Sequence, residues 1–140
     1  MRLRFTVPGE PTAKERPRMY NGHAFTPEKT KKYEAEVKFW YYQSTGREQL
    51  DGEIEATINA YYKIPKSASK KKRQQMLSGE IRPTKKPDLD NVAKSILDAL
   101  NGIAYHDDSA VVSLHIEKWW SDEPRVEVLL SDEKKLPFEE

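Results

Sequence analysis

Hydrophobic and polar residues alternate along four stretches of the chain, and this period of two predicts four β-strands. The stretches cover residues 2–7, 54–62, 112–120 and 126–130. Only a short segment that contains Pro124 separates the last two stretches. We therefore expect these two strands to pair with each other as an antiparallel hairpin.

Three further segments predict helices, at about residues 27–46, 69–77 and 89–101. The first begins at a Thr-Pro-Glu sequence, which supplies a cap, a proline for the first turn and an acid. The last has apolar residues at steps of three and four and stops at an Asn-Gly pair, so it is the most clearly defined helix. Prolines and a second Asn-Gly pair predict an extended arm or hairpin over residues 10–25.

A chain of 140 residues, of which 36% are hydrophobic, has the size of one ordinary domain with a modest core. The elements predict an α+β fold, a single small domain in which two main helices pack on a mixed or antiparallel sheet of about four strands. We expect this domain to cover residues 1–131 and a flexible acidic tail to cover residues 132–140. No segment has the roughly 20 apolar residues of a membrane span, so a cytoplasmic location is expected.

The net charge of +1 conceals a separation of charge along the chain. Residues 1–32 hold eight Lys or Arg against three acids, and residues 63–86 hold nine against one. Residues 87–140 reverse this balance, with five Lys or Arg against thirteen acids. Basic segments of this kind favour a polyanionic ligand, and we therefore expect the chain to bind a nucleic acid.

Cations on the arm and around the short helix are the candidates for contacts with a DNA backbone. They are Lys14, Arg16, Arg18, Lys70, Lys71, Lys72, Arg73, Lys85 and Lys86. A solvated helix face or a mobile loop is the alternative explanation for the run at 70–73. The cluster of aspartates that follows this run favours the binding role.

Aspartates around the third predicted helix are the candidates for catalysis. Asp88 and Asp90 stand at its start, and Asp107 and Asp108 follow its end. The first pair has a structural alternative, because an aspartate at a helix N-terminus caps free N–H groups and interacts favourably with the helix dipole. The second pair stands just before a strand, in the kind of loop where functional residues gather.

A shared site requires the chain to return along this helix, which is roughly 20 Å long. The seven residues 102–108, when extended, just cover that distance. Asp88, Asp90 and Asp108 would then form an oxygen-only site, with Asp107 beside it, whose repulsion a hard divalent cation offsets. No cysteine is present to provide a thiolate ligand. We therefore expect Mg²⁺, with Mn²⁺ as a substitute.

Lys94 lies one helical turn after Asp90 and one turn before Asp98. Its ammonium group can form an i,i+4 ion pair, which stabilises a helix by a few tenths of a kcal/mol. It can also reach the metal site and stabilise charge on a phosphate or on a leaving oxygen. Both roles remain open at this point.

The segment PDLDNVAKSILDALNGIAYHDD, with the apolar strand after it, resembles the motif of the RusA family of Holliday junction resolvases. PGEP, KERPR and FTPEKTKKYEAEV resemble the basic loop and first helix of that family, so the resemblance covers most of residues 1–120. It implies a small α+β homodimer that binds four-way DNA junctions and makes paired Mg²⁺-dependent nicks. By position, Asp88, Asp90 and Asp108 would be the essential carboxylates, Lys94 the essential lysine and Asp107 an accessory acid. Which acid of the second pair touches the metal is left open.

The first functional hypothesis is therefore a Mg²⁺-dependent, structure-selective endonuclease that resolves Holliday junctions by paired symmetric nicks in DNA recombination and repair. The alternative is a non-catalytic nucleic-acid-binding module whose aspartates cap helices. A nucleotidyltransferase or glycosyltransferase would need a phosphate-binding loop, and the sequence has no Gly-rich candidate. A homodimer is expected because a four-way junction has two-fold related strands, and no membrane partner is expected.

Overall fold

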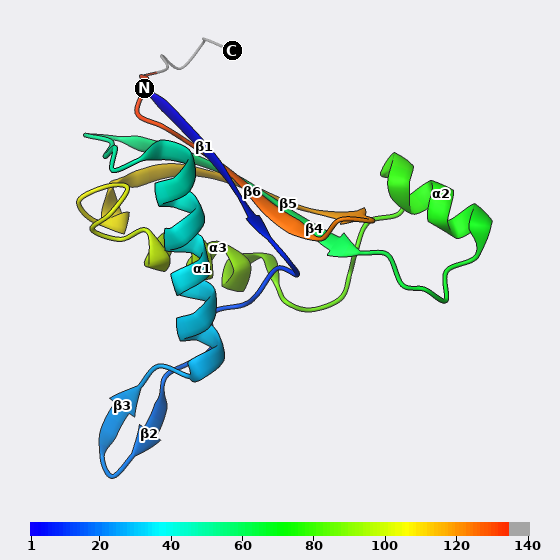
Figure 1. Cartoon of the computed structure of the whole chain (residues 1–140), viewed down its shortest axis with the longest axis horizontal. Coiled ribbons are helices and arrows are strands. Elements are labelled where there is room, and N and C mark those ends of the chain that lie inside the picture. The colour runs from blue at the N-terminus through cyan, green and yellow to red at the C-terminus, as the bar shows by residue number, and fades with distance from the viewer. Residues whose placement is uncertain (135–140) are drawn as a thin grey trace.

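The computed structural model describes residues 1–134 (Figure 1). In chain order its elements are β1 (Arg2–Pro8), β2 (Arg18–Tyr20), β3 (His23–Phe25), α1 (Glu28–Thr45), β4 (Ile54–Lys63), α2 (Lys70–Ser78), α3 (Leu89–Ala99), the 3₁₀ turn η1 (Asp108–Ala110), β5 (Val111–Ser121) and β6 (Arg125–Ser131). The predicted α+β class is confirmed: a mixed sheet of four strands carries two of the helices on one face.

The strands of the main sheet lie in the order β1-β6-β4-β5. β6 is antiparallel to both β1 and β4, whereas β5 is parallel to β4. The predicted hairpin between residues 112–120 and 126–130 is therefore wrong, because β4 lies between β5 and β6. The short segment 122–124 can pass over the end of β4, because an extended segment of this length spans about 10 Å, which is two strand spacings.

β4 lies inside the sheet, between β5 and β6, and its face toward the helices is wholly apolar. Its helix-facing side chains all have 0% exposure, and they are Ile54, Ala56, Ile58, Ala60 and Tyr62. A strand with a neighbour on both sides also satisfies its backbone N–H and C=O groups within the sheet. The alternation over 54–62 thus predicted the buried face of β4 but not its two neighbours.

α1 and α3 cover the same face of the sheet, α1 over β1 and α3 over β5 (Figure 1). Tyr33, Val37 and Tyr41 of α1 are buried against it, while Trp40 is only partly covered. α2 lies away from this layer, beyond the end of β4 (Figure 1). Within residues 1–134, we find no helix long and apolar enough to cross a membrane.

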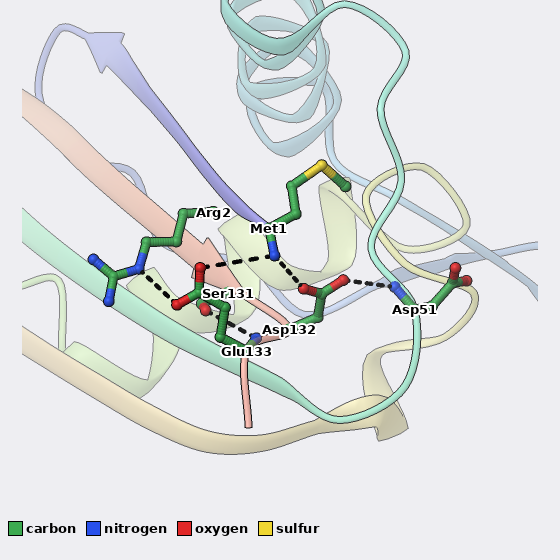
Figure 2. A network of polar contacts seen from close by, with 6 residues as sticks. All are labelled: Met1, Arg2, Asp51, Ser131, Asp132 and Glu133. Atoms are coloured by element: carbon green, nitrogen blue, oxygen red, sulfur yellow. Dashed lines mark hydrogen bonds and ion pairs between the residues drawn. The ribbon is translucent and has the colours of Figure 1, made fainter. Parts of the chain in front are cut away.

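A polar network fastens the two ends of the described chain to each other, as Figure 2 shows. The Met1 ammonium group lies 2.7 Å from Oδ1 of Asp132, and the Asp51 backbone N–H donates to the other oxygen of that carboxylate. Arg2 pairs with Glu133 at 3.2 Å. The predicted tail thus begins with two anchored acids, and its residues 135–140 lie outside the described part of the chain.

Buried tyrosines predict that the fold loses stability in alkaline solution. Burial raises the pKa of Tyr33, Tyr62 and Tyr105, and it raises the pKa of Tyr62 to about 12. The stabilisation is complete below the ordinary tyrosine pKa of about 10 and is lost as the pH rises toward the folded-state pKa, because the unfolded chain loses its phenolic protons first. The midpoint of thermal unfolding should therefore fall steadily above pH about 10.

Tyr62→Phe isolates the contribution of one of these phenols to the pH dependence of stability. This variant should be less stable at neutral pH, because it loses the hydrogen bond from the hydroxyl to the Pro87 carbonyl. Its midpoint should nevertheless fall less steeply with pH than that of the wild type. Tyr42→Phe is the control, because Tyr42 is 42% exposed. An equal slope for Tyr62→Phe and the wild type would contradict the explanation.

Candidate active site

The N-terminal end of α3 carries the first pair of acids. Asp88 is the N-cap residue, with an extended backbone conformation, and its side chain forms no capping hydrogen bond. Asp90 is exposed in the first turn. Both carboxylates therefore project from a helix end that favours negative charge without satisfying its N–H groups as a cap would.

A hollow of about 350 Å³ lies beside Asp88. Its lining residues are Pro11, Thr12, Ala13, Glu15, Lys29, Lys86, Pro87, Asp88 and Asn91. The arm, the first turn of α1 and the start of α3 meet there, so two carboxylates and two lysines share one concave surface. Lys29 and Asn91 were not among the predicted site residues. Two sequence features could have identified them: Lys29 stands in the first helical turn after the basic arm, and Asn91 belongs to the DLDN sequence.

The C-terminal end of α3 carries the second pair of acids. Ser109 donates hydrogen bonds to Asp107 through its backbone N–H, at 3.1 Å, and through its hydroxyl, and these bonds lower the pKa of Asp107. The backbone N–H of Asp108 donates to Oδ1 of Asn101 at 3.2 Å. The hydroxyl of buried Tyr105 donates to the Leu97 carbonyl at 2.7 Å. These bonds hold the segment after α3 close to the end of the helix.

The two pairs of acids are therefore not brought together within one chain. An 11-residue helix, about 16 Å long, separates Asp88 from the residues after Ala99. Within residues 1–134, no three Asp, Glu or His side chains form a group that could hold a metal ion. The expected return of residues 102–108 along the helix does not occur, because Tyr105 and its neighbours pack under the helix end. The chain instead runs back toward the start of α3 along β5. In the second half of this strand, the ammonium group of Lys118 donates a hydrogen bond to the carbonyl of Lys85, which lies just before α3.

Asp98 forms ion pairs with two of the predicted functional lysines, Lys94 and Lys14. Its Oδ2 lies 3.3 Å from the Lys94 ammonium and 3.5 Å from the Lys14 ammonium. The Lys94 side chain is 61% exposed, so its ion pair with Asp98 leaves the ammonium accessible to a ligand. Lys14 also lies 3.0 Å from Glu34, and its side chain is only 18% exposed. Lys14 thus connects the arm to α1 and α3, and its predicted contact with DNA stays a prediction.

The other predicted DNA contacts differ in how freely they extend into solvent. Arg16, Arg18, Lys85, Lys86 and the three lysines of α2 are exposed. Arg73 is paired with Asp122, so it attaches α2 to the loop between β5 and β6. The Arg82 guanidinium lies 3.5 Å from the centre of the Trp119 ring, on the face of the sheet opposite Trp120. Of the four predicted cations on α2, Lys70, Lys71 and Lys72 are therefore available for contacts with DNA.

Comparison with known proteins shows the family to which the chain belongs. The profile of the family described as endodeoxyribonuclease RusA matches residues 8–131. An uncharacterized Bacillus subtilis (strain 168) protein, YqaN, is 41% identical over 136 residues, which cover 93% of this chain and 96% of that protein. The chain belongs to the RusA endodeoxyribonuclease family.

Proposed function

We propose that this protein is a Mg²⁺-dependent, structure-selective endonuclease that resolves Holliday junctions by paired symmetric nicks. The observation that carries the proposal is the match to the endodeoxyribonuclease RusA family over residues 8–131. The basic arm and α2 support it, because a site rich in carboxylates needs neighbouring cations to hold a DNA backbone. We further propose a role in DNA recombination and repair and a cytoplasmic location.

A homodimer would complete the site that one chain leaves divided. In a two-fold symmetric pair with the two α3 helices antiparallel, the start of each helix lies beside the end of the other. Asp88 and Asp90 of one copy would then face Asp107 and Asp108 of the second copy, twice per dimer. Oxygen ligands of this kind suit Mg²⁺ or Mn²⁺, which when bound would lower the pKa of a water and offset phosphate charge.

The surface around α3 and β5 supports such a dimer. β5 lies at the edge of the sheet, and no strand of residues 1–134 pairs with its outer side. Val112 and Leu114 on this strand are 65% and 42% exposed, which is unusual for apolar side chains beside a helix that packs on the same strand. Exposed Asp90 and Lys94 of α3 lie on the surface that the second copy would approach.

Each residue of the site receives a role in this proposal. Asp88, Asp90 and Asp108 hold the cation, and Asp107 is an accessory acid beside it. Lys94 stabilises negative charge on the phosphate, with Asp98 orienting its ammonium group. Lys29 and Lys86, which line the hollow at Asp88, neutralise the approaching DNA backbone.

A cleavage assay tests the proposal directly. The purified protein is incubated with a synthetic four-way junction and with a linear duplex of the same sequence, with Mg²⁺, with Mn²⁺ or with a chelator. We expect two symmetric nicks in the junction with either metal and none with the chelator. Binding without cleavage under every divalent metal would instead support the non-catalytic binding module.

The α2 lysines should contribute to DNA affinity through phosphate contacts. Lys70, Lys71 and Lys72 are all exposed, so their joint replacement by glutamine should weaken binding to any DNA. The plot of log binding constant against log salt concentration should become less steep by about 2 to 3, because each lost phosphate contact reduces the slope by about 0.9. Lys38→Gln, an exposed lysine on α1, is the control. An unchanged slope would remove α2 from the DNA-binding surface.

A further inference from the structure

The hairpin of β2 and β3 extends from the body of the protein beyond the first turn of α1 (Figure 1). All six residues of its strands are exposed. Three of them are large apolar or aromatic side chains, Met19 at 67%, Tyr20 at 70% and Phe25 at 44% exposure. A two-stranded hairpin gains little stability of its own, and exposed aromatic side chains on it add none in water. These side chains are therefore available to a ligand.

The register of the hairpin gathers the aromatic side chains on one face. Arg18 pairs with Phe25, and Tyr20 pairs with His23. Because side chains alternate along a strand, these four residues project from the same face, and Met19 with Ala24 projects from the other. A largely apolar hollow of about 470 Å³ lies on this face, lined by Tyr20, Asn21, His23 and Phe25. The face combines two aromatic rings, an imidazole and a guanidinium.

The charge around the hairpin identifies the class of ligand. Residues 15–32 contain five Lys or Arg and two acids, of which Glu15 lies 3.7 Å from the Arg18 guanidinium. Arg16, Lys29, Lys31 and Lys32, at the base of the hairpin, are all exposed. A polyanion held by these cations would pass the aromatic face, so the ligand should offer both phosphates and flat apolar rings. DNA in which a base is free of its stack has both properties.

We propose that the hairpin face formed by Arg18, Tyr20, His23 and Phe25 binds an unstacked nucleobase of DNA. Tyr20 and Phe25 stack on the base, and Arg18 binds the neighbouring phosphate. This inference rests on the proposed action on branched DNA and goes beyond it, because it assigns recognition of the branch point to the hairpin. The base pairs of a linear duplex are stacked, whereas those at a branch point are more easily opened, so the face would favour branched DNA.

Binding in the presence of a chelator tests the inference without cleavage. Three ligands are compared: a linear duplex, the same duplex with one bulged thymine, and a four-way junction. Tyr20→Ala should weaken binding to the bulged duplex and the junction by about tenfold, as expected for the loss of one base–aromatic stack, and leave linear duplex binding unchanged. Tyr20→Trp should restore the preference. Phe39→Ala is the control, because Phe39 is a similarly exposed aromatic residue, at 52%, on α1.

Crosslinking locates the base itself. A 5-iodouracil at the branch point, irradiated in the complex, should crosslink within residues 18–25, whereas one in the middle of an arm should not. Crosslinks elsewhere, or unchanged junction affinity in Tyr20→Ala with unchanged thermal unfolding, would overturn the inference. A change from dimer to monomer in Tyr20→Ala would overturn it as well, since the hairpin would then serve subunit contact. The wild-type cleavage assay remains a separate result, so a failure of this inference is distinguishable from a failure of the proposed function.

Discussion

Asp90→Asn is expected to bind four-way junctions at least as tightly as the wild type but to cut them at least about 100-fold more slowly. The loss reflects removal of a carboxylate from the proposed metal site, where charge stabilisation contributes several kcal/mol and each 1.36 kcal/mol is about tenfold in rate. Affinity is maintained or increased because one negative charge near the DNA backbone is removed. Gel-shift titration with a chelator and single-turnover cleavage with Mg²⁺ measure the two quantities separately.

Glu80→Gln is the matched control for Asp90→Asn. It also removes one exposed negative charge, but from the loop after α2 rather than from α3. Its binding can therefore increase through the same electrostatic effect while cleavage stays at the wild-type rate. If Asp90→Asn cuts at the wild-type rate, Asp90 is not part of the site. If the wild type does not cut with any divalent metal, the nuclease proposal itself is wrong.

Two inactive variants are expected to restore activity to each other when they share a dimer. Asp90→Asn and Asp108→Asn homodimers should both be inactive, because every composite site contains one altered acid. In a heterodimer of the two, one site collects both altered acids and the other collects none. Heterodimers isolated through two different tags should therefore cut at about half the wild-type rate per dimer. On a supercoiled plasmid with an extruded cruciform, they should yield nicked circles rather than linear DNA.

A second heterodimer is the control for this restoration. Asp88→Asn and Asp90→Asn affect the same end of α3, so each site in their heterodimer keeps one altered acid. This heterodimer should be as inactive as its parents. If the Asp90→Asn and Asp108→Asn heterodimer is also inactive while the wild type cuts, the site does not combine acids from the two ends of α3 in different copies. This result would contradict the composite site but not the nuclease function.

Local sequence patterns predicted the helices and strands within a few residues. Alternation over 54–62 corresponds to β4, and the steps of three and four from Leu89 correspond to α3. Ser69 caps α2, because its hydroxyl accepts a hydrogen bond from the Lys72 backbone N–H at 3.2 Å. These features depend on neighbours close in the chain, so they could be inferred from residue order alone.

Strand order could not be inferred in the same way. The short connection 122–124 is compatible with a hairpin and with a crossing over one intervening strand, and its residues do not distinguish the two. The pattern of burial does not distinguish them either, because the helix-facing side chains of β1, β4 and β6 are all apolar and buried. The pairing of β4 with β5 and β6 is a property of the whole sheet.

The amino-acid sequence by itself supplied the candidates for the proposed chemistry: two acid pairs around one amphipathic helix, a lysine between them and basic segments beside them. Only the tertiary structure decided where these groups lie. Hydrogen bonds from Asp108 to Asn101 and from Tyr105 to Leu97 keep the second pair at the C-terminal end of α3, and ion pairs with Glu34 and Asp98 hold Lys14 against α1 and α3. Such contacts join residues on different elements or turns, and chain length limits how far apart two groups can lie without specifying where they meet.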